Sequence, residues 1–179
     1  MNVLTTIIVV IASIIVLMLV LALFVRKGYT ISRQIIIDKP NQQVFDYIKH
    51  LKNQDFFSKW VMTDPNMKKE FKGVDGTVGF VYSWSGNKKA GEGNQEIMNI
   101  VEGKKVDIEV RFVRPFTAVA STPFETEATS SNQTKVTWGM SSKMNYPMNI
   151  ILLFLNMESL LGKDMDTSLG NLKTILEKS

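Results

Sequence analysis

The chain has 179 residues, a formal net charge of +4, no cysteine and a single histidine, His50. Without cysteine it cannot form disulfides, zinc–thiolate centres or a cysteine nucleophile, and one histidine cannot complete a zinc site of the usual His/Cys kind. We therefore predict no metal site and no cofactor. The lysines and arginines are scattered among acidic residues, whereas nucleic-acid binders more often gather them in a stripe with aromatics, so we predict no nucleic-acid partner.

An uncharged apolar segment comes first along the chain. Residues 3–25 contain no charged side chain, and Arg26 and Lys27 follow directly. Because about 20 apolar residues in a helix cross the roughly 30 Å hydrocarbon core of a bilayer, this segment predicts a transmembrane helix. A cleaved signal peptide would have a basic start, a shorter apolar core and a small-residue cleavage site, which this segment lacks. We predict a retained single-pass membrane anchor over residues 1–27, with a domain of residues 28–179 on the cytoplasmic side, as its basic flank favours.

One strand and two short helices are predicted next. Residues 29–37 are rich in isoleucine, and three of these isoleucines share one face of an extended chain, which predicts a strand. Apolar residues then recur at helical spacing from residue 40 to residue 51, which predicts a helix with one buried stripe. A short helical turn is predicted over residues 54–60.

From residue 67 to residue 144 the apolar pattern has the two-residue period of strands. Glycine, asparagine and serine cluster between the apolar runs and indicate turns. Such spacing predicts a meandering antiparallel sheet with one face in water. The six predicted strands are residues 67–72, 78–84, 89–101, 106–112, 116–129 and 135–144.

The C-terminal part returns to helical spacing. Apolar residues between Met157 and Leu176 step by three or four over five turns and predict one long helix. Before it, residues 148–155 are apolar on all sides except at Asn149, and they are too few to span a bilayer. This stretch could be a buried helix start, a lid over a cavity mouth, or an apolar patch in the membrane interface, and the sequence leaves all three open.

The order of these elements is that of the helix-grip fold. Residues 29–178 resemble the START-like (SRPBCC) superfamily, which includes the polyketide cyclase/dehydrase branch and the birch-pollen-allergen-like proteins. The resemblance rests on the element order and on the local sequences NQQVFDYI (41–48), FSKW (57–60), WSGN (84–87), GEGNQEI (91–97) and GKDMDTSLGNL (162–172). It implies an α+β domain in which a curved antiparallel sheet surrounds the long C-terminal helix, with a cavity between them. Members bind lipids, sterols, polyketides and other apolar molecules, and the superfamily has no shared catalytic motif.

Strand parity and helix spacing select the residues that would line such a cavity. Tyr82 and Gln95 would be the polar groups that orient a ligand. The competing interpretation is that these side chains simply pack the core. Gly162 and Gly170 on the final helix could either leave open volume or allow close approach of helix and sheet. The predicted lining is Tyr82, Trp84, Gln95, Val110, Phe112, Trp138, Met140, Leu161 and Met165.

Catalysis would need a positioned acid or base, and the most suggestive pair is Glu125 and Glu127 on one strand face. Phe124 is the natural core residue of that strand, so the two glutamates are expected to face water instead. We therefore predict no catalytic residues and lean against an enzyme.

The sequence supports three functional hypotheses. The first is a membrane-anchored protein that binds a hydrophobic small molecule or lipid between the sheet and the last helix. The second is a cyclase/dehydrase-type enzyme acting on an apolar substrate in the same cavity. The third is a non-catalytic interaction or stress-related protein whose interior is filled by its own side chains. The ligand, the pathway and the oligomeric state are not encoded in any recognisable pattern.

Overall fold

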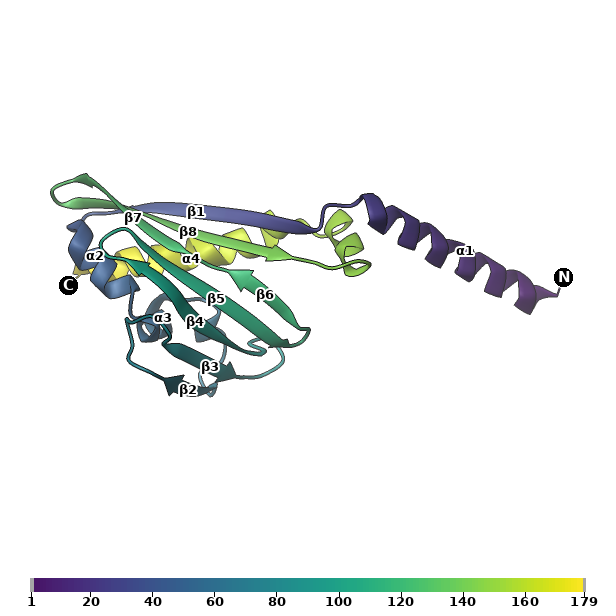
Figure 1. The fold of residues 1–179 in the computed structure, drawn as a ribbon, viewed down its shortest axis with the longest axis horizontal. Helices are drawn as coiled ribbons and strands as arrows, with labels where there is room; N and C mark the ends of the chain where they lie inside the picture. Colours follow the sequence, from purple (N-terminus) through teal and green to yellow (C-terminus); the bar gives the residue numbers. More distant parts are fainter. Residues whose placement is uncertain (1, 179) are drawn as a thin grey trace.

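The structure is a computed structural model that describes residues 2–178. Its N-terminal helix, α1 (Val3–Phe24), projects away from a single α+β domain (Figure 1). Asn2 caps this helix, because its side-chain oxygen accepts a hydrogen bond of 2.9 Å from the backbone N–H of Thr5. In the described part of the chain α1 alone is long and apolar enough to cross a membrane. Such a helix fits a membrane span and also a signal sequence.

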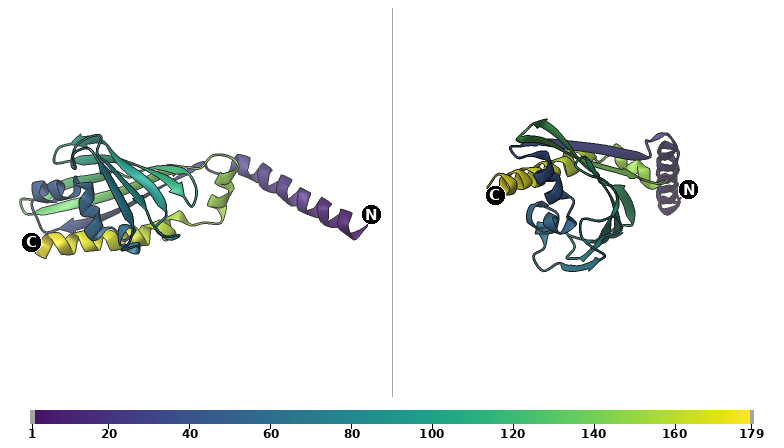
Figure 2. Two further views of the ribbon diagram at one scale, coloured as in Figure 1. Left: turned by 90° about the horizontal axis from the view of Figure 1, so that it is seen from below. Right: turned by 60° about the vertical axis from the view of Figure 1, so that its left-hand side comes forward.

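The domain is built on one curved sheet of eight antiparallel strands, in the order β1-β8-β6-β5-β4-β3-β2, with β7 paired to β5 and β8. Figure 2 shows this sheet curving around the long C-terminal helix and the short helices, which cover its concave face. The curved antiparallel sheet and the final helix predicted from the sequence are thus confirmed. The strands are β1 (Gly28–Ile37), β2 (Lys68–Lys72), β3 (Val81–Ser85), β4 (Glu92–Val101), β5 (Lys105–Arg114), β6 (Ala118–Ser121), β7 (Phe124–Ser130) and β8 (Gln133–Lys143).

The prediction of a single strand over residues 116–129 is wrong, because this stretch forms two strands, β6 and β7. The break falls at Thr122 and Pro123, and proline has no N–H to donate to a strand ladder. The Pro123 carbonyl instead accepts a hydrogen bond of 2.9 Å from the backbone N–H of Gly139. On both sides of the break the chain pairs with β8 in the same register, with Ala120 opposite Ser142 and Phe124 opposite Trp138. The extra strand makes the sheet eight-stranded.

Short helices close one side of the concave face. They are α2 (Asn41–Ile48), α3 (Gln54–Phe57) and the 3-10 turns η1 (Leu51–Asn53) and η2 (Val61–Thr63). The long helix α4 (Met157–Lys178) buries an apolar stripe against the sheet that includes Met165, Leu169 and Leu172. The predicted long helix therefore has the predicted buried face.

The two glycines of α4 have different surroundings. A Cβ on Gly162 would lie 2.0 Å from an Arg33 guanidinium nitrogen, whereas a Cβ on Gly170 would have no atom within 4 Å. Arg33 forms ion pairs with Glu158 and Asp166 of the same helix. Gly162 therefore allows an arginine of β1 to approach α4 closely, and it does not open volume for a ligand.

Residues 148–155 do not extend α4. Met148–Leu153 form a separate 3-10 helix, η3, between β8 and α4. The buried side chain of Asn149 donates hydrogen bonds to the backbone oxygens of Ala22, at 2.7 Å, and of Val25, at 3.0 Å. The only polar residue of this stretch thus joins the domain to the last turn of α1.

Candidate functional site

The seven sheet residues predicted to line a cavity share the concave face of the sheet. Register pairing places Tyr82 opposite Gln95 and Gln95 opposite Val110. The next pairs on the same face bring Trp84 and Phe112 to either side of Gly93. A Cβ at Gly93 would lie 2.7 Å from the Trp84 ring, so the glycine makes room for that ring. Parity thus assembles these aromatic and apolar side chains beneath α4.

Tyr82 and Gln95, the predicted orienting groups, are bonded inside the protein. The hydroxyl of Tyr82 donates a hydrogen bond of 2.8 Å to Asp55, and the amide of Gln95 donates one of 3.2 Å to Gln54. Both partners belong to α3. Burial, and then the Asp55 carboxylate, raise the pKa of the Tyr82 hydroxyl well above its usual range, so it keeps its proton at neutral pH. The two groups fasten α3 to the sheet.

A second group of predicted residues forms a buried inner wall, which consists of Val110, Trp138, Met140 and Met165. The ring of Trp138 stacks on Phe124 at a centroid distance of 4.8 Å. Trp138 is 3% exposed, and its indole N–H has no hydrogen-bond partner among residues 2–178. Leaving a buried donor unpaired costs about 1–3 kcal/mol, so an acceptor placed beside this N–H would stabilise the site.

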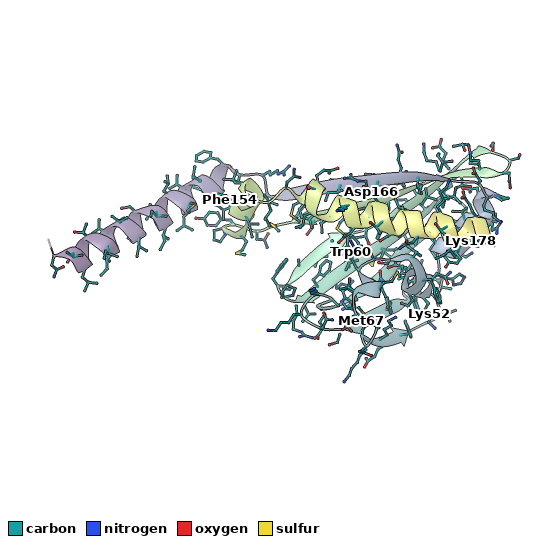
Figure 3. All side chains as sticks on the ribbon, turned by 180° about the vertical axis from the view of Figure 1, so that it is seen from behind. Lys52, Trp60, Met67, Phe154, Asp166 and Lys178 are labelled. Carbon is teal, nitrogen blue, oxygen red and sulfur yellow. The ribbon has the colours of Figure 1, made fainter. Side chains whose placement is uncertain are left out.

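Trp60 closes the inner wall from the side of the short helices. Its ring meets Trp138 edge-on at 5.3 Å, and its own indole N–H donates a hydrogen bond of 3.2 Å to Asp164 of α4. Lys59 adds an ion pair of 2.7 Å to the same carboxylate. Figure 3 shows Trp60 below α4, between that helix and the rest of the domain. The sequence marks Trp60 only as the last residue of FSKW (57–60), and because it lies in a turn after α3 no strand or helix periodicity assigns it to the lining.

The remaining predicted residues are half-buried, namely Trp84 and Phe112, hereafter the rim, and Leu161 near the start of α4. Trp84 and Phe112 meet edge-to-face at 6.0 Å. The rim lies at one end of the domain, because β3 and β5 end there and α4 begins there (Figure 1). This is also the end from which α1 projects.

Two hollows in the described structure lie elsewhere. One, of about 710 Å³, is bordered by residues of β5, β7 and β8, and the other, of about 300 Å³, lies at the start of α4. Neither is lined by any of the nine predicted residues. In the first hollow Glu125 and Glu127 are exposed and pair with Lys105 and Lys135, so the prediction that these glutamates face water is confirmed.

Metal binding has no candidate site in the described residues, since no group of three or more His, Cys, Asp or Glu side chains comes together. His50 lies near a single carboxylate, with its Nδ1 atom 3.6 Å from Asp75. One histidine beside one carboxylate does not form a coordination sphere.

Solved structures share this fold, although no protein-family model and no curated protein sequence matches this chain. A truncated norcoclaurine synthase from Thalictrum flavum gives a TM-score of 0.64 at 8% identity, covering 85% of this chain and 95% of that one. The Ara h 8.0201 structure gives 0.56 at 13% identity, covering 84% and 96%. The Aha1 dimer from Colwellia psychrerythraea gives 0.57 at 16% identity, covering 83% and 96%.

These matches show that the chain has the helix-grip fold that its sequence predicted. At these identities the likeness defines the fold alone. The matches include an enzyme and other kinds of protein, and they do not single out the polyketide cyclase/dehydrase branch.

Proposed function

We propose that this protein is a single-pass membrane-anchored domain that binds a hydrophobic small molecule or lipid on the concave face of its sheet. The observation that carries the proposal is the unpaired N–H of Trp138 within a wall of apolar side chains. An apolar ligand with one hydrogen-bond acceptor would satisfy this donor and would gain roughly 25 cal/mol for each Å² of apolar surface buried.

The rim provides the route to the inner wall. Trp84 and Phe112 remain partly exposed at the end of the domain from which α1 projects. Admission of a ligand requires side chains behind the rim to move, and Met140 and Met165 supply flexible thioethers that can do so. One of the solved structures with this fold is norcoclaurine synthase from Thalictrum flavum in complex with dopamine and hydroxybenzaldehyde, which supports ligand binding by a domain of this shape.

Binding fits the site better than catalysis does. The two carboxylates that border the inner wall, Asp55 and Asp164, are already held by Lys69 at 2.8 Å and by Lys59 at 2.7 Å. The Tyr82 hydroxyl is also engaged, and its raised pKa makes it a poor general acid.

Intrinsic fluorescence provides a direct test, because the three tryptophans of the chain all border this site. The full chain in lipid nanodiscs would be titrated with a brominated fatty acid, which quenches indole emission on contact. Binding predicts saturable quenching that the unbrominated acid reverses. Quenching that rises linearly with bromine in the bilayer would contradict it.

Two substitutions make the test specific to the unpaired donor. Trp138→Phe removes the N–H while keeping an aromatic ring, and it should weaken binding about two- to tenfold, the value of one net hydrogen bond. The control is Trp84→Phe, because the Trp84 indole already donates to the Ala90 carbonyl at 3.2 Å and should matter less. Equal losses in the two variants would refute the role of the Trp138 N–H.

The dense packing of the interior favours a second candidate, an interaction protein that carries no ligand. Ring stacking of Phe124 on Trp138 and the internal pairing of Tyr82 and Gln95 fill much of the concave face. If no member of a panel of fatty acids, isoprenoids and sterols produces saturable quenching, this second function becomes the better account.

A further inference from the structure

The contact between α1 and η3 has a geometry that fixes the domain against the end of the apolar helix. Ala22, the one buried residue within Val3–Phe24, lies under η3, and its carbonyl accepts a hydrogen bond from Asn149. On the other side of the junction the Lys27 carbonyl accepts a hydrogen bond of 2.9 Å from Met144, which extends the β1–β8 ladder almost to α1. Asn149 therefore holds the end of α1 to η3, and the Lys27 bond holds the linker that follows α1 to the end of β8.

These connections determine the depth of η3 relative to a bilayer. At 1.5 Å per residue, a helix of 22 residues is about 33 Å long, close to the roughly 30 Å hydrocarbon core. If α1 spans, its last turn lies at the boundary between acyl chains and headgroups. Asn149 bonds to carbonyls of that last turn, so η3 lies at the same boundary.

The chemistry of this region suits the boundary. Residues 144–157 contain no charged side chain. The single polar side chain of residues 148–155 is turned inward, while large apolar side chains are exposed, with Phe154 at 68% and Met148 at 62%. Figure 3 shows Phe154 at the junction of α1 and the domain. An exposed apolar cluster of this kind marks an interaction surface.

Basic residues surround the same junction. Arg26 and Lys27 follow α1, and Lys143 lies opposite Gly28 in the β1–β8 ladder. Within the described chain none of these three makes an ion pair, which leaves them free to meet anionic headgroups. An apolar cluster beside unpaired basic side chains is the pattern of an interfacial membrane element.

We propose that residues 144–155, hereafter the η3 segment, lie in the headgroup–acyl boundary of the bilayer that α1 spans. In that position the hydrogen bonds of Asn149 to the end of α1 fix the orientation of the domain, with the rim of the concave face towards the lipid surface. The inference rests on the membrane anchor of the proposed function. It implies that the apolar ligand comes from the bilayer itself.

The absence of cysteine permits a clean test in the full chain. Single-cysteine variants would carry an environment-sensitive fluorophore in vesicles of phosphatidylcholine and phosphatidylglycerol. Phe154→Cys reports on the η3 segment. Val78→Cys is the matched control, because this apolar residue is 58% exposed before β3, at the end of the sheet away from α1. Leu17→Cys, in α1, reports whether the helix spans.

The proposal predicts that the label at residue 154 emits further to the blue than the label at residue 78. Nitroxide lipids labelled near the headgroup should quench the label at residue 154 more than lipids labelled near the chain end do. Aqueous iodide should quench the label at residue 154 several-fold less than the label at residue 78. Equal behaviour at residues 154 and 78 would overturn the proposal. Protection from iodide without nitroxide quenching would overturn it as well, in favour of a protein partner.

The controls separate this proposal from the proposed function. If chain-end nitroxides fail to quench the label at Leu17, α1 does not span, and the anchor and the η3 proposal fail together. If the labels at residues 17 and 154 behave as predicted but brominated ligands give no saturable quenching, the η3 proposal stands and the ligand-binding function fails.

Discussion

Tyr82→Phe tests whether this tyrosine serves the fold or a ligand. The substitution removes a hydroxyl that donates to the Asp55 carboxylate at 2.8 Å from a residue only 1% exposed. A hydrogen bond to a charged group contributes about 1.5–3 kcal/mol. Asp55 keeps its ion pair with Lys69 and some access to water, so the lower figure applies. We expect the free energy of unfolding to fall by about 1.5 kcal/mol, or about 3–6 °C in Tm for a domain of this size.

The pH dependence of the same variant provides a second signature. Tyrosine loses its proton above about pH 10 in an unfolded chain, whereas the folded protein raises the pKa of Tyr82 and retains the proton. The folded state then binds more protons than the unfolded state, so stability falls as pH rises beyond 10. Tyr82→Phe should weaken this alkaline loss.

Thermal unfolding of the full chain in nanodiscs, followed by circular dichroism, measures both effects. Tyr146→Phe is the control, because Tyr146 is exposed and its substitution should change stability by less than about 0.5 kcal/mol. Unchanged melting of Tyr82→Phe together with weaker ligand binding would refute the structural role and restore Tyr82 as a ligand-orienting group.

Two further predictions concern α4 and the junction with α1. Gly170→Ala should stabilise the protein by about 1 kcal/mol through helix propensity, because its Cβ enters open space. Gly162→Ala should be about 1–2 kcal/mol less stable than Gly170→Ala, since its Cβ displaces Arg33, and equal urea midpoints would contradict this. Asn149→Ala removes two hydrogen bonds to the end of α1 and should lower the free energy of unfolding by about 1–3 kcal/mol, measured by thermal unfolding. Asn145→Ala, at an exposed residue, is the control and should change it by less than about 0.5 kcal/mol. Similar losses in the two variants would refute the role of Asn149 in holding α1.

The fold could be predicted because local patterns and tertiary structure agree. Alternating apolar residues placed the concave face correctly along β3, β4 and β5, and helical spacing identified the buried stripe of α4. The split between β6 and β7 was missed because a proline in an otherwise strand-like run can either end a strand or lie at a sheet edge. Both β6 and β7 pair with β8 in one continuous register, so the interruption is local to Thr122 and Pro123.

The site was harder to predict because strand parity shows which face of the sheet a side chain points to but not which group it bonds to. Tyr82 and Gln95 point to the concave face as expected, but their partners come from α3, a turn about 30 or 40 residues earlier. Asn149 illustrates the same limit. Its presence as the lone polar residue of an apolar stretch was a usable signal, yet only the folded chain shows that it bonds to α1, more than 120 residues away.

The most direct test of ligand binding on the concave face is photocrosslinking with a diazirine-bearing fatty acid. The full chain in nanodiscs would be irradiated, digested and mapped by mass spectrometry. The account predicts saturable adducts on Trp138, Met140 or Met165, side chains that are at most 6% exposed, and their loss when unlabelled fatty acid competes. Adducts confined to α1 and the η3 segment, however much lipid is added, would contradict it.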